Sequence, residues 1–221
     1  MTTVLVVCRD ATGAHWELGP ASPDRPLTLL GWRTRPEPVD AGVPAPVAAI
    51  LSRAMCATGW VAFPASPLIE FDEHEPRTDD ATRVARVGVS RPGWRSVLGG
   101  ARPIARQIST RRPEHARLLF EDSGHPWWLG AQVALISHPD HQPPTLDGAT
   151  WRALLGVGWR GAADTLAPFH ALGAIRAGVD GDVLGLSSAT PAFADEFLRT
   201  VRDEAEAAGC TLREITETEF P

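Results

Sequence analysis

The sequence contains no lysine, no tyrosine and no asparagine, and all 21 of its basic side chains are arginines. Without lysine there is no lysine Schiff base, no anchor for pyridoxal phosphate and no Walker-type phosphate loop. Without tyrosine there is no phenol to act as a general acid, and without asparagine there is neither a Cys-His-Asn triad nor an N-glycosylation acceptor. These absences are typical of a genome very rich in G and C, and we expect a bacterial protein.

Long apolar runs are also missing. None reaches the roughly 18–20 residues that a membrane helix needs, and the apolar run at Thr3–Cys8 follows no basic region, so it predicts a strand rather than a signal peptide. The cysteines Cys8, Cys56 and Cys210 are odd in number and widely spaced, which favours buried free thiols over a disulfide framework or a zinc site. We therefore expect a globular, cytoplasmic protein.

The order of the predicted elements favours an α+β (or α/β) fold: a mixed sheet with an antiparallel N-terminal part, a central hairpin and a C-terminal βαβ unit, with helices packed on the sheet. Strands are predicted at Thr3–Cys8, Ala14–Leu18, Leu27–Arg33, Trp60–Pro64, Leu68–Phe71, Ala116–Glu121, Trp128–Ser137, Val183–Leu186 and Thr211–Thr216, and helices at Val47–Thr58, Ser96–Ile108 (weak), Leu146–Leu155 and Ala162–Ala177. We divide the chain into residues 1–72, an Arg/Gly/Pro-rich connection at 73–115, and residues 116–221, or treat all of it as one domain.

The C-terminal unit has the most consistent signals. A helix is predicted between the strands Val183–Leu186 and Thr211–Thr216, because Thr190 is a preferred N-cap and Pro191 suits the first turn. Its apolar residues share one helical face: Phe193, Phe197, Leu198 and Val201. We expect a βαβ unit with its two strands parallel in one sheet.

Charge is unevenly distributed along the chain. Residues 77–117 carry ten arginines against three acidic side chains, a local balance of +7, whereas the whole chain has a net charge of −6. The segment has loop composition, and arginine's planar fork suits carboxylate or phosphate recognition and stacking. We predict a binding surface formed by Arg83, Arg86, Arg91, Trp94, Arg95, Arg106, Arg111 and Arg112. The alternative is that these arginines pair internally with carboxylates or keep a long loop solvated.

A second candidate is Asp122-Ser-Gly-His-Pro126, which lies between two predicted strands. It resembles the Asp-Ser-Gly-Gly-Pro around the nucleophile of chymotrypsin-like proteases over five residues, with His125 in place of a glycine. The resemblance would make Ser123 a nucleophile. A hydrolase centred on Ser123 could instead use a different arrangement, with His125 or His138 as base and Asp122 or Asp140 as orienting acid. The alternative is a hairpin turn capped by its own side chains, since no upstream histidine leaves room for a preceding barrel half.

The histidines suggest a third candidate. His138-Pro-Asp-His141, with His125 nearby across the predicted hairpin, could supply ligands to a zinc or iron ion, although the spacing is not characteristic of metal sites. The acidic run at residues 70–75 could contribute, or could form a solvated strand end. A metal-assisted hydrolase using His138 and His141 is the function this pattern would support.

Two weaker patterns concern anions. Residues 156–161 match G-x-G-x-x-G, with Asp180 and Asp182 at the distance of a ribose-binding acid, but a helix end and turn is the preferred interpretation. Residues 187–190 join a strand to a helix N-terminus, where free N–H groups favour anions, although capping of the helix is the preferred interpretation.

The leading hypothesis is a non-enzymatic accessory or assembly protein that binds an acidic protein or nucleic acid through residues 77–117.

Overall fold

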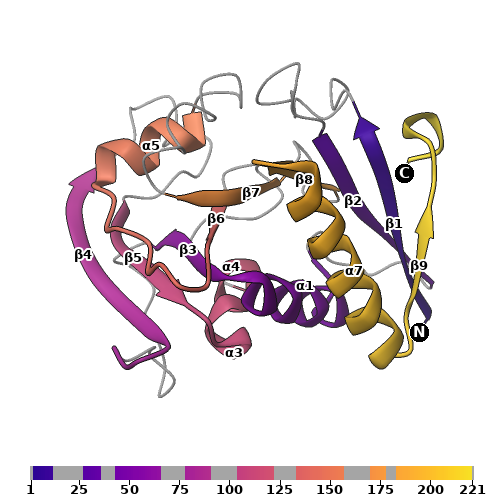
Figure 1. Cartoon of the computed structure of the whole chain (residues 1–221), viewed down its shortest axis with the longest axis horizontal. Helices are drawn as coiled ribbons and strands as arrows, with labels where there is room; N and C mark the ends of the chain where they lie inside the picture. Colours follow the sequence, from indigo (N-terminus) through magenta and orange to yellow (C-terminus); the bar gives the residue numbers. More distant parts are fainter. Residues whose placement is uncertain are drawn as a thin grey trace.

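The computed structural model describes residues 2–11, 27–35, 43–65, 78–90, 104–121, 133–156, 170–177 and 183–220. Its strands form one mixed sheet in the order β4-β5-β3-β6-β7-β8-β2-β1-β9 (Figure 1). All neighbours are antiparallel except β9, which runs parallel to β1. The strands are β1 (Thr2–Ala11), β2 (Leu27–Arg35), β3 (Trp60–Ala65), β4 (Thr82–Ser90), β5 (Ile104–Thr110), β6 (Val133–Ser137), β7 (Ala171–Ala177), β8 (Val183–Ser188) and β9 (Thr211–Glu214). The predicted α+β fold is confirmed.

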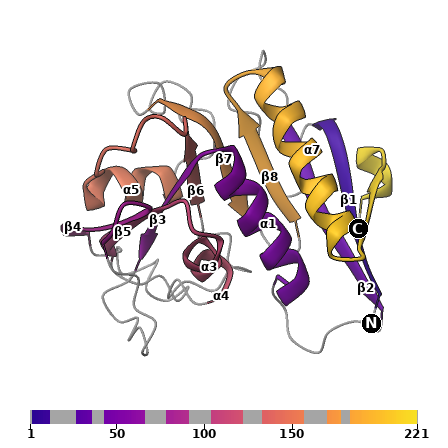
Figure 2. The ribbon, with the colours of Figure 1, turned by 60° about the horizontal axis from the view of Figure 1, so that its bottom comes forward.

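Helices cover both faces of the sheet. The long helices α1 (Ala45–Thr58) and α7 (Pro191–Ala207) lie side by side on one face, with the short helices α3 (Pro113–Ala116) and α4 (Leu118–Glu121) beyond α1 (Figure 2). Helix α5 (Gly148–Gly156) packs on the other face. Successive strand residues point to opposite faces, so Val61 and Phe63 join the core under α1 whereas Ala62 joins the core under α5.

The C-terminal βαβ unit is confirmed. Strands β8 and β9 are parallel members of one sheet, and β2 and β1 lie between them. The hydroxyl of Thr190 caps α7 by accepting a hydrogen bond of 3.2 Å from the backbone N–H of Phe193. Phe193, Phe197 and Val201 are buried, as their helical spacing predicts. The capping threonine and the helical spacing of the apolar residues agree here, which is why the local sequence was sufficient.

Three predicted elements are wrong. Residues 82–90 and 104–110 form the antiparallel pair β4 and β5, where the sequence suggested a loop and a weak helix at Ser96–Ile108. Residues 116–121 belong to α3 and α4, so the predicted strand Ala116–Glu121 and its hairpin do not form. Strand β7 replaces the C-terminal part of the helix predicted at Ala162–Ala177.

The strand at 171–177 has a packing reason that the sequence does not display. A Cβ on Gly173 would stand 2.6 Å from Cε1 of Phe193, so the sheet needs glycine here to let the ring of α7 approach its backbone. Glycine and alanine are weak strand formers, and the tertiary contact overrides their propensity.

The remaining predicted elements are present with small shifts of boundary, except for Ala14–Leu18, Leu68–Phe71 and the first half of the strand predicted at Trp128–Ser137, which lie outside the described residues. The single sheet takes strands from all three parts into which we divided the chain. Among the described residues, no helix is both long and apolar enough to cross a membrane.

Candidate binding surface

The two edges of the sheet carry opposite charge. Strand β4 forms one edge and belongs to the arginine-rich segment, whereas β9 forms the other and continues into the acidic turn η5 (Glu217–Glu219) (Figure 1). The segregation seen along the sequence therefore becomes a separation in space, with a basic edge and an acidic edge at opposite ends of a nine-stranded sheet.

The arginines of the basic segment are mostly exposed where the structure describes them. Arg83 and Arg86 on β4, and Arg111 and Arg112 after β5, are exposed, whereas Arg106 on β5 is half-buried. Among the described residues, Arg83, Arg86 and Arg111 form no ion pair with a carboxylate. Arg91, Trp94 and Arg95 lie outside the described residues, and their part in the surface stays a prediction.

Arg112 is the exception, because it holds a turn together. Its guanidinium lies 2.7 Å from the carboxylate of Asp79 and 3.8 Å from that of Glu114. The Asp79 carboxylate also accepts hydrogen bonds from the backbone N–H groups of Ala81 and Thr82, both 2.8 Å. These N–H donors and then Arg112 hold the pKa of Asp79 below its ordinary value. The turn at 78–82 thus fixes the start of β4.

Register places Arg83 and Arg86 on opposite faces of β4. Arg86 stands opposite Arg106, two residues before Ile108, whose side chain lies in the core under α1. Arg83 points to the same face of β4 as Val87, and Val87 lies in the core under α5. The two guanidinium groups therefore flank the outer edge of the sheet from both sides.

A hydroxyl chain that the sequence did not reveal anchors this edge to α3. The Thr82 hydroxyl lies 2.8 Å from the Thr110 hydroxyl on β5 and 2.7 Å from Nδ1 of His115. Burial is the main cause that lowers the pKa of His115, which keeps its ring neutral. Both threonines are completely buried and His115 is half-buried, so this chain ties β4 and β5 to α3.

Gln107 anchors the other side of the same edge. Its amide oxygen accepts hydrogen bonds from Leu146 N–H (2.8 Å) and from the indole N–H of Trp151 on α5 (3.0 Å). Its amide nitrogen donates to the Ser109 hydroxyl and to the Pro144 carbonyl. Only 1% of this residue is exposed, and all four of its hydrogen-bonding positions are used. The basic edge is therefore a rigid platform.

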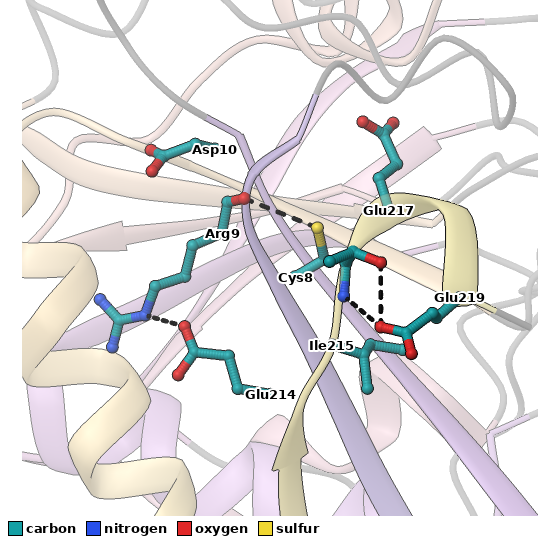
Figure 3. Close-up of a pocket in the computed structure, with 8 residues that line it drawn as sticks. Cys8, Arg9, Asp10, Glu214, Ile215, Glu217 and Glu219 are labelled. Carbon is teal, nitrogen blue, oxygen red and sulfur yellow. Dashed lines mark hydrogen bonds and ion pairs between the residues drawn. The ribbon is translucent and has the colours of Figure 1, made fainter.

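The acidic edge holds an open cleft of about 490 Å³ (Figure 3). The end of β1 lines it with Cys8, Arg9 and Asp10, and the end of β9 with the segment after it brings three further carboxylates, so that acidic groups outnumber the single arginine. Arg9 is already paired with Glu214 (3.2 Å) and with Asp195 of α7. The other carboxylates that line the cleft make it unsuited to an anion.

The Cys8 thiol in this cleft is not an activated nucleophile. Burial, followed by the nearby carboxylates of Glu217, Asp10 and Glu214, raises the pKa of Cys8, so the thiol stays protonated at neutral pH. Its S–H points to the Arg9 carbonyl at 3.5 Å. The reactive form of cysteine is the thiolate, so this geometry opposes cysteine catalysis.

The structure brings the two predicted metal-ligating histidines together and adds a third. The ring centroid of His141 lies 5.4 Å from that of His138 and 5.6 Å from that of His170, which precedes β7. Within the described ranges, however, no group of three His, Cys, Asp or Glu has an arrangement able to hold a metal ion. The predicted pair His138 and His141 stays a prediction, since His125 lies outside these ranges.

His138 also differs from the base of a catalytic triad. The backbone N–H of Asp140 donates to its Nδ1 at 3.2 Å, the nitrogen that in a triad base donates to the orienting carboxylate. The Asp140 carboxylate, 3.6 Å from the same nitrogen, is exposed.

No family model, curated protein or solved structure matches the chain. Its function must therefore be argued from its own residues.

Several sequence candidates fall outside the described residues. These are Asp122, Ser123 and His125 of the hydrolase hypothesis, residues 157–161 of the G-x-G-x-x-G pattern, and Asp180 with Asp182. At residues 187–190 the structure shows the capping that we preferred, because Thr190 caps α7.

Proposed function

We propose that this protein is a non-enzymatic binding module that engages an acidic protein partner through its arginine-bearing edge, and that it acts as an accessory or assembly protein of the bacterial cytoplasm. The observation that carries the proposal is the exposure of Arg83, Arg86 and Arg111, none of which forms an ion pair with a described carboxylate. In an acidic protein, such cations at one rigid edge form a local site for negative charge.

The rest of the described chain favours binding over catalysis. The acidic cleft contains a protonated thiol, both threonines of the threonine-histidine chain are buried, and Nδ1 of His138 accepts a hydrogen bond from the Asp140 backbone. Clustered groups with matched pKa values would have supported an enzyme.

Overall charge favours a protein over nucleic acid as the partner. The net charge is −6, and the opposite edge of the sheet carries Glu214, Glu217 and Glu219. A long polyanion that extends beyond the basic edge would be repelled by the rest of the molecule, whereas a short acidic segment would meet only the arginines.

The test is a comparison of two triple variants with the same change of net charge. One replaces Arg83, Arg86 and Arg111 with alanine. The control replaces the exposed arginines at the acidic end, Arg199, Arg202 and Arg213. Binding of labelled poly-L-glutamate and of a duplex oligonucleotide is measured by fluorescence anisotropy over a salt series.

We expect the first variant to bind poly-L-glutamate about tenfold more weakly and the control to bind like the wild type, because exposed charge pairs contribute about 0.2–1 kcal/mol each. Affinity should fall as salt rises. Equal losses in both variants would contradict a localised site. Tighter binding of the oligonucleotide, with a salt slope near −0.9 per phosphate contact, would assign the surface to nucleic acid instead.

A further inference from the structure

The outer side of β4 presents backbone groups as well as arginines. The backbone N–H of Arg111 donates to the carbonyl of Ala81 at 2.7 Å, which fixes Ala81 as a residue whose backbone faces β5. Backbone groups alternate in direction along an antiparallel strand, so those of Thr82, Val84 and Arg86 face outward. No described strand pairs with this side of β4.

The first part of this outer edge is closed by the preceding turn. The Thr82 carbonyl accepts a hydrogen bond from the N–H of Asp79 (2.7 Å), and the Val84 N–H donates to the Thr78 hydroxyl (3.2 Å). The Val84 carbonyl and both backbone groups of Arg86 form no hydrogen bond with another described residue outside β4. An irregularity in the register after Arg86 then ends the regular ladder.

The outer edge of β4 next to Val84 and Arg86 leaves room for an approaching chain. Gly88 is exposed, and a Cβ placed on it would meet nothing within 4 Å. Arg83 and Arg86 stand on the two faces of the strand, so an added strand would have one guanidinium above and one below its own backbone. Opposite charges on neighbouring strands stabilise their pairing.

We propose, resting on the function proposed above, that the acidic partner binds as an extended segment that adds to the sheet beside β4, with its backbone hydrogen-bonded to Val84 and Arg86 and its carboxylates directed to Arg83 and Arg86. Strand addition takes its affinity from main-chain hydrogen bonds and its selectivity from side chains that alternate between the two faces. Here the free backbone groups of Val84 and Arg86 would supply the affinity, and the side chains of Arg83 and Arg86 would supply the selectivity.

The probe is a fluorescein-labelled peptide of alternating glutamate and valine, followed by two adjacent glutamates so that both faces carry a carboxylate. Its matched control has the same sequence with every backbone nitrogen methylated, which removes the N–H donors of both strand edges and leaves the charge unchanged. We expect the methylated peptide to bind about tenfold more weakly or worse, since each main-chain hydrogen bond contributes about 0.5–1.5 kcal/mol. Equal affinity of the two peptides would overturn strand addition.

Two substitutions at one position separate backbone from charge. Arg86→Ala removes the guanidinium and keeps the N–H, whereas Arg86→Pro also removes the N–H, which faces away from β5 and is not part of the β4–β5 ladder. Strand addition predicts that Arg86→Pro binds the unmethylated peptide at least about fivefold more weakly than Arg86→Ala, with similar melting temperatures. The peptide comparison stands even if Arg86→Pro fails to fold.

The outcomes also separate this inference from the function on which it rests. If both Arg86 variants weaken binding equally and methylation has no effect, the arginines bind charge without strand addition, so this inference fails and the proposed function stands. If neither the Arg86 variants nor the triple variant affects binding, both fail. Concentration-dependent self-association of the free protein, lost in Arg86→Pro, would make a second copy of the chain the occupant and would overturn the proposal of an acidic partner.

Discussion

Replacement of Gln107 tests whether the basic edge depends on one buried amide. Gln107→Leu keeps a side chain of similar size and removes both acceptor positions of the amide oxygen. Two donors then lose their partner: the backbone N–H of Leu146 and the indole N–H of Trp151. Leu146 is 4% exposed and Trp151 is fully buried, so water cannot easily replace the lost oxygen.

The expected loss of stability follows from these two unpaired donors. A buried donor left without a partner costs about 1–3 kcal/mol, so the free energy of unfolding should fall by about 2–6 kcal/mol. The total stability of a domain is about 5–15 kcal/mol, which makes this a large fraction. Urea unfolding followed by far-ultraviolet circular dichroism measures the change, and the slope of the transition shows whether unfolding remains cooperative.

A double-mutant cycle with Trp151→Phe identifies the cause. The phenylalanine ring has no N–H, so the double variant should lose less stability than the sum of the single variants, with a coupling of about 1–3 kcal/mol. Thr200→Ala is a control, because its hydroxyl donates to the Glu196 carbonyl on the exposed side of α7. A loss below about 1 kcal/mol in Gln107→Leu, without coupling to Trp151, would refute the reasoning.

Three further predictions concern the core, a buried cysteine and a half-buried histidine. Phe197→Ala should lower the free energy of unfolding by about 3–5 kcal/mol, since this side chain is fully buried under α7, and a melting curve like that of the wild type would contradict the packing. Burial, reinforced by Glu114, raises the pKa of Cys56 to about 12, so iodoacetamide at about pH 8 should modify the half-buried Cys210 and leave Cys56 unmodified in the native protein, as peptide mass spectrometry would show. The folded-state pKa of His115 is lowered from 6.5, so its contribution to stability is complete above that value and is lost as pH falls through the folded-state pKa. Relative to His115→Gln, the wild type should lose stability between about pH 7 and about pH 5, and identical pH profiles would exclude this role.

Sequence reasoning succeeded where local signals agreed with the tertiary structure. The helix α7 begins at a capping threonine and a first-turn proline, and its apolar spacing matches its buried face. The N-terminal strand pair β1 and β2 follows from apolar runs of strand length. In these segments the chain needs no distant partner to select its local conformation.

Sequence reasoning failed where a distant contact decides the structure. Strand β4 exposes Arg83 and Arg86 on opposite faces, which removes the alternation that predicts a strand, because an edge strand is only partly covered. Strand β7 depends on the approach of Phe193 to Gly173. The run at residues 116–121 is apolar because α3 and α4 bury Leu119 and Phe120, and apolar character alone does not separate a short helix from a strand.

The free edge of β4 could not be predicted from composition, although the arginines could. Charge density at residues 77–117 is visible in the sequence. The outward direction of the Arg86 backbone depends on the strand register and on the turn at residues 78–82, neither of which a loop-like composition indicates.

The sheet order also determines when the molecule can be completed during synthesis. Strands β2 and β3 are consecutive in the chain, yet β8, β7 and β6 lie between them in the sheet. The β1–β2 pair must therefore wait with both outer edges unpaired until residues 183–188 and then residues 211–214 have left the ribosome. Such long-range pairing slows folding and exposes strand edges to wrong partners, so nascent chains of this protein should depend strongly on chaperones until the last third of the sequence has emerged.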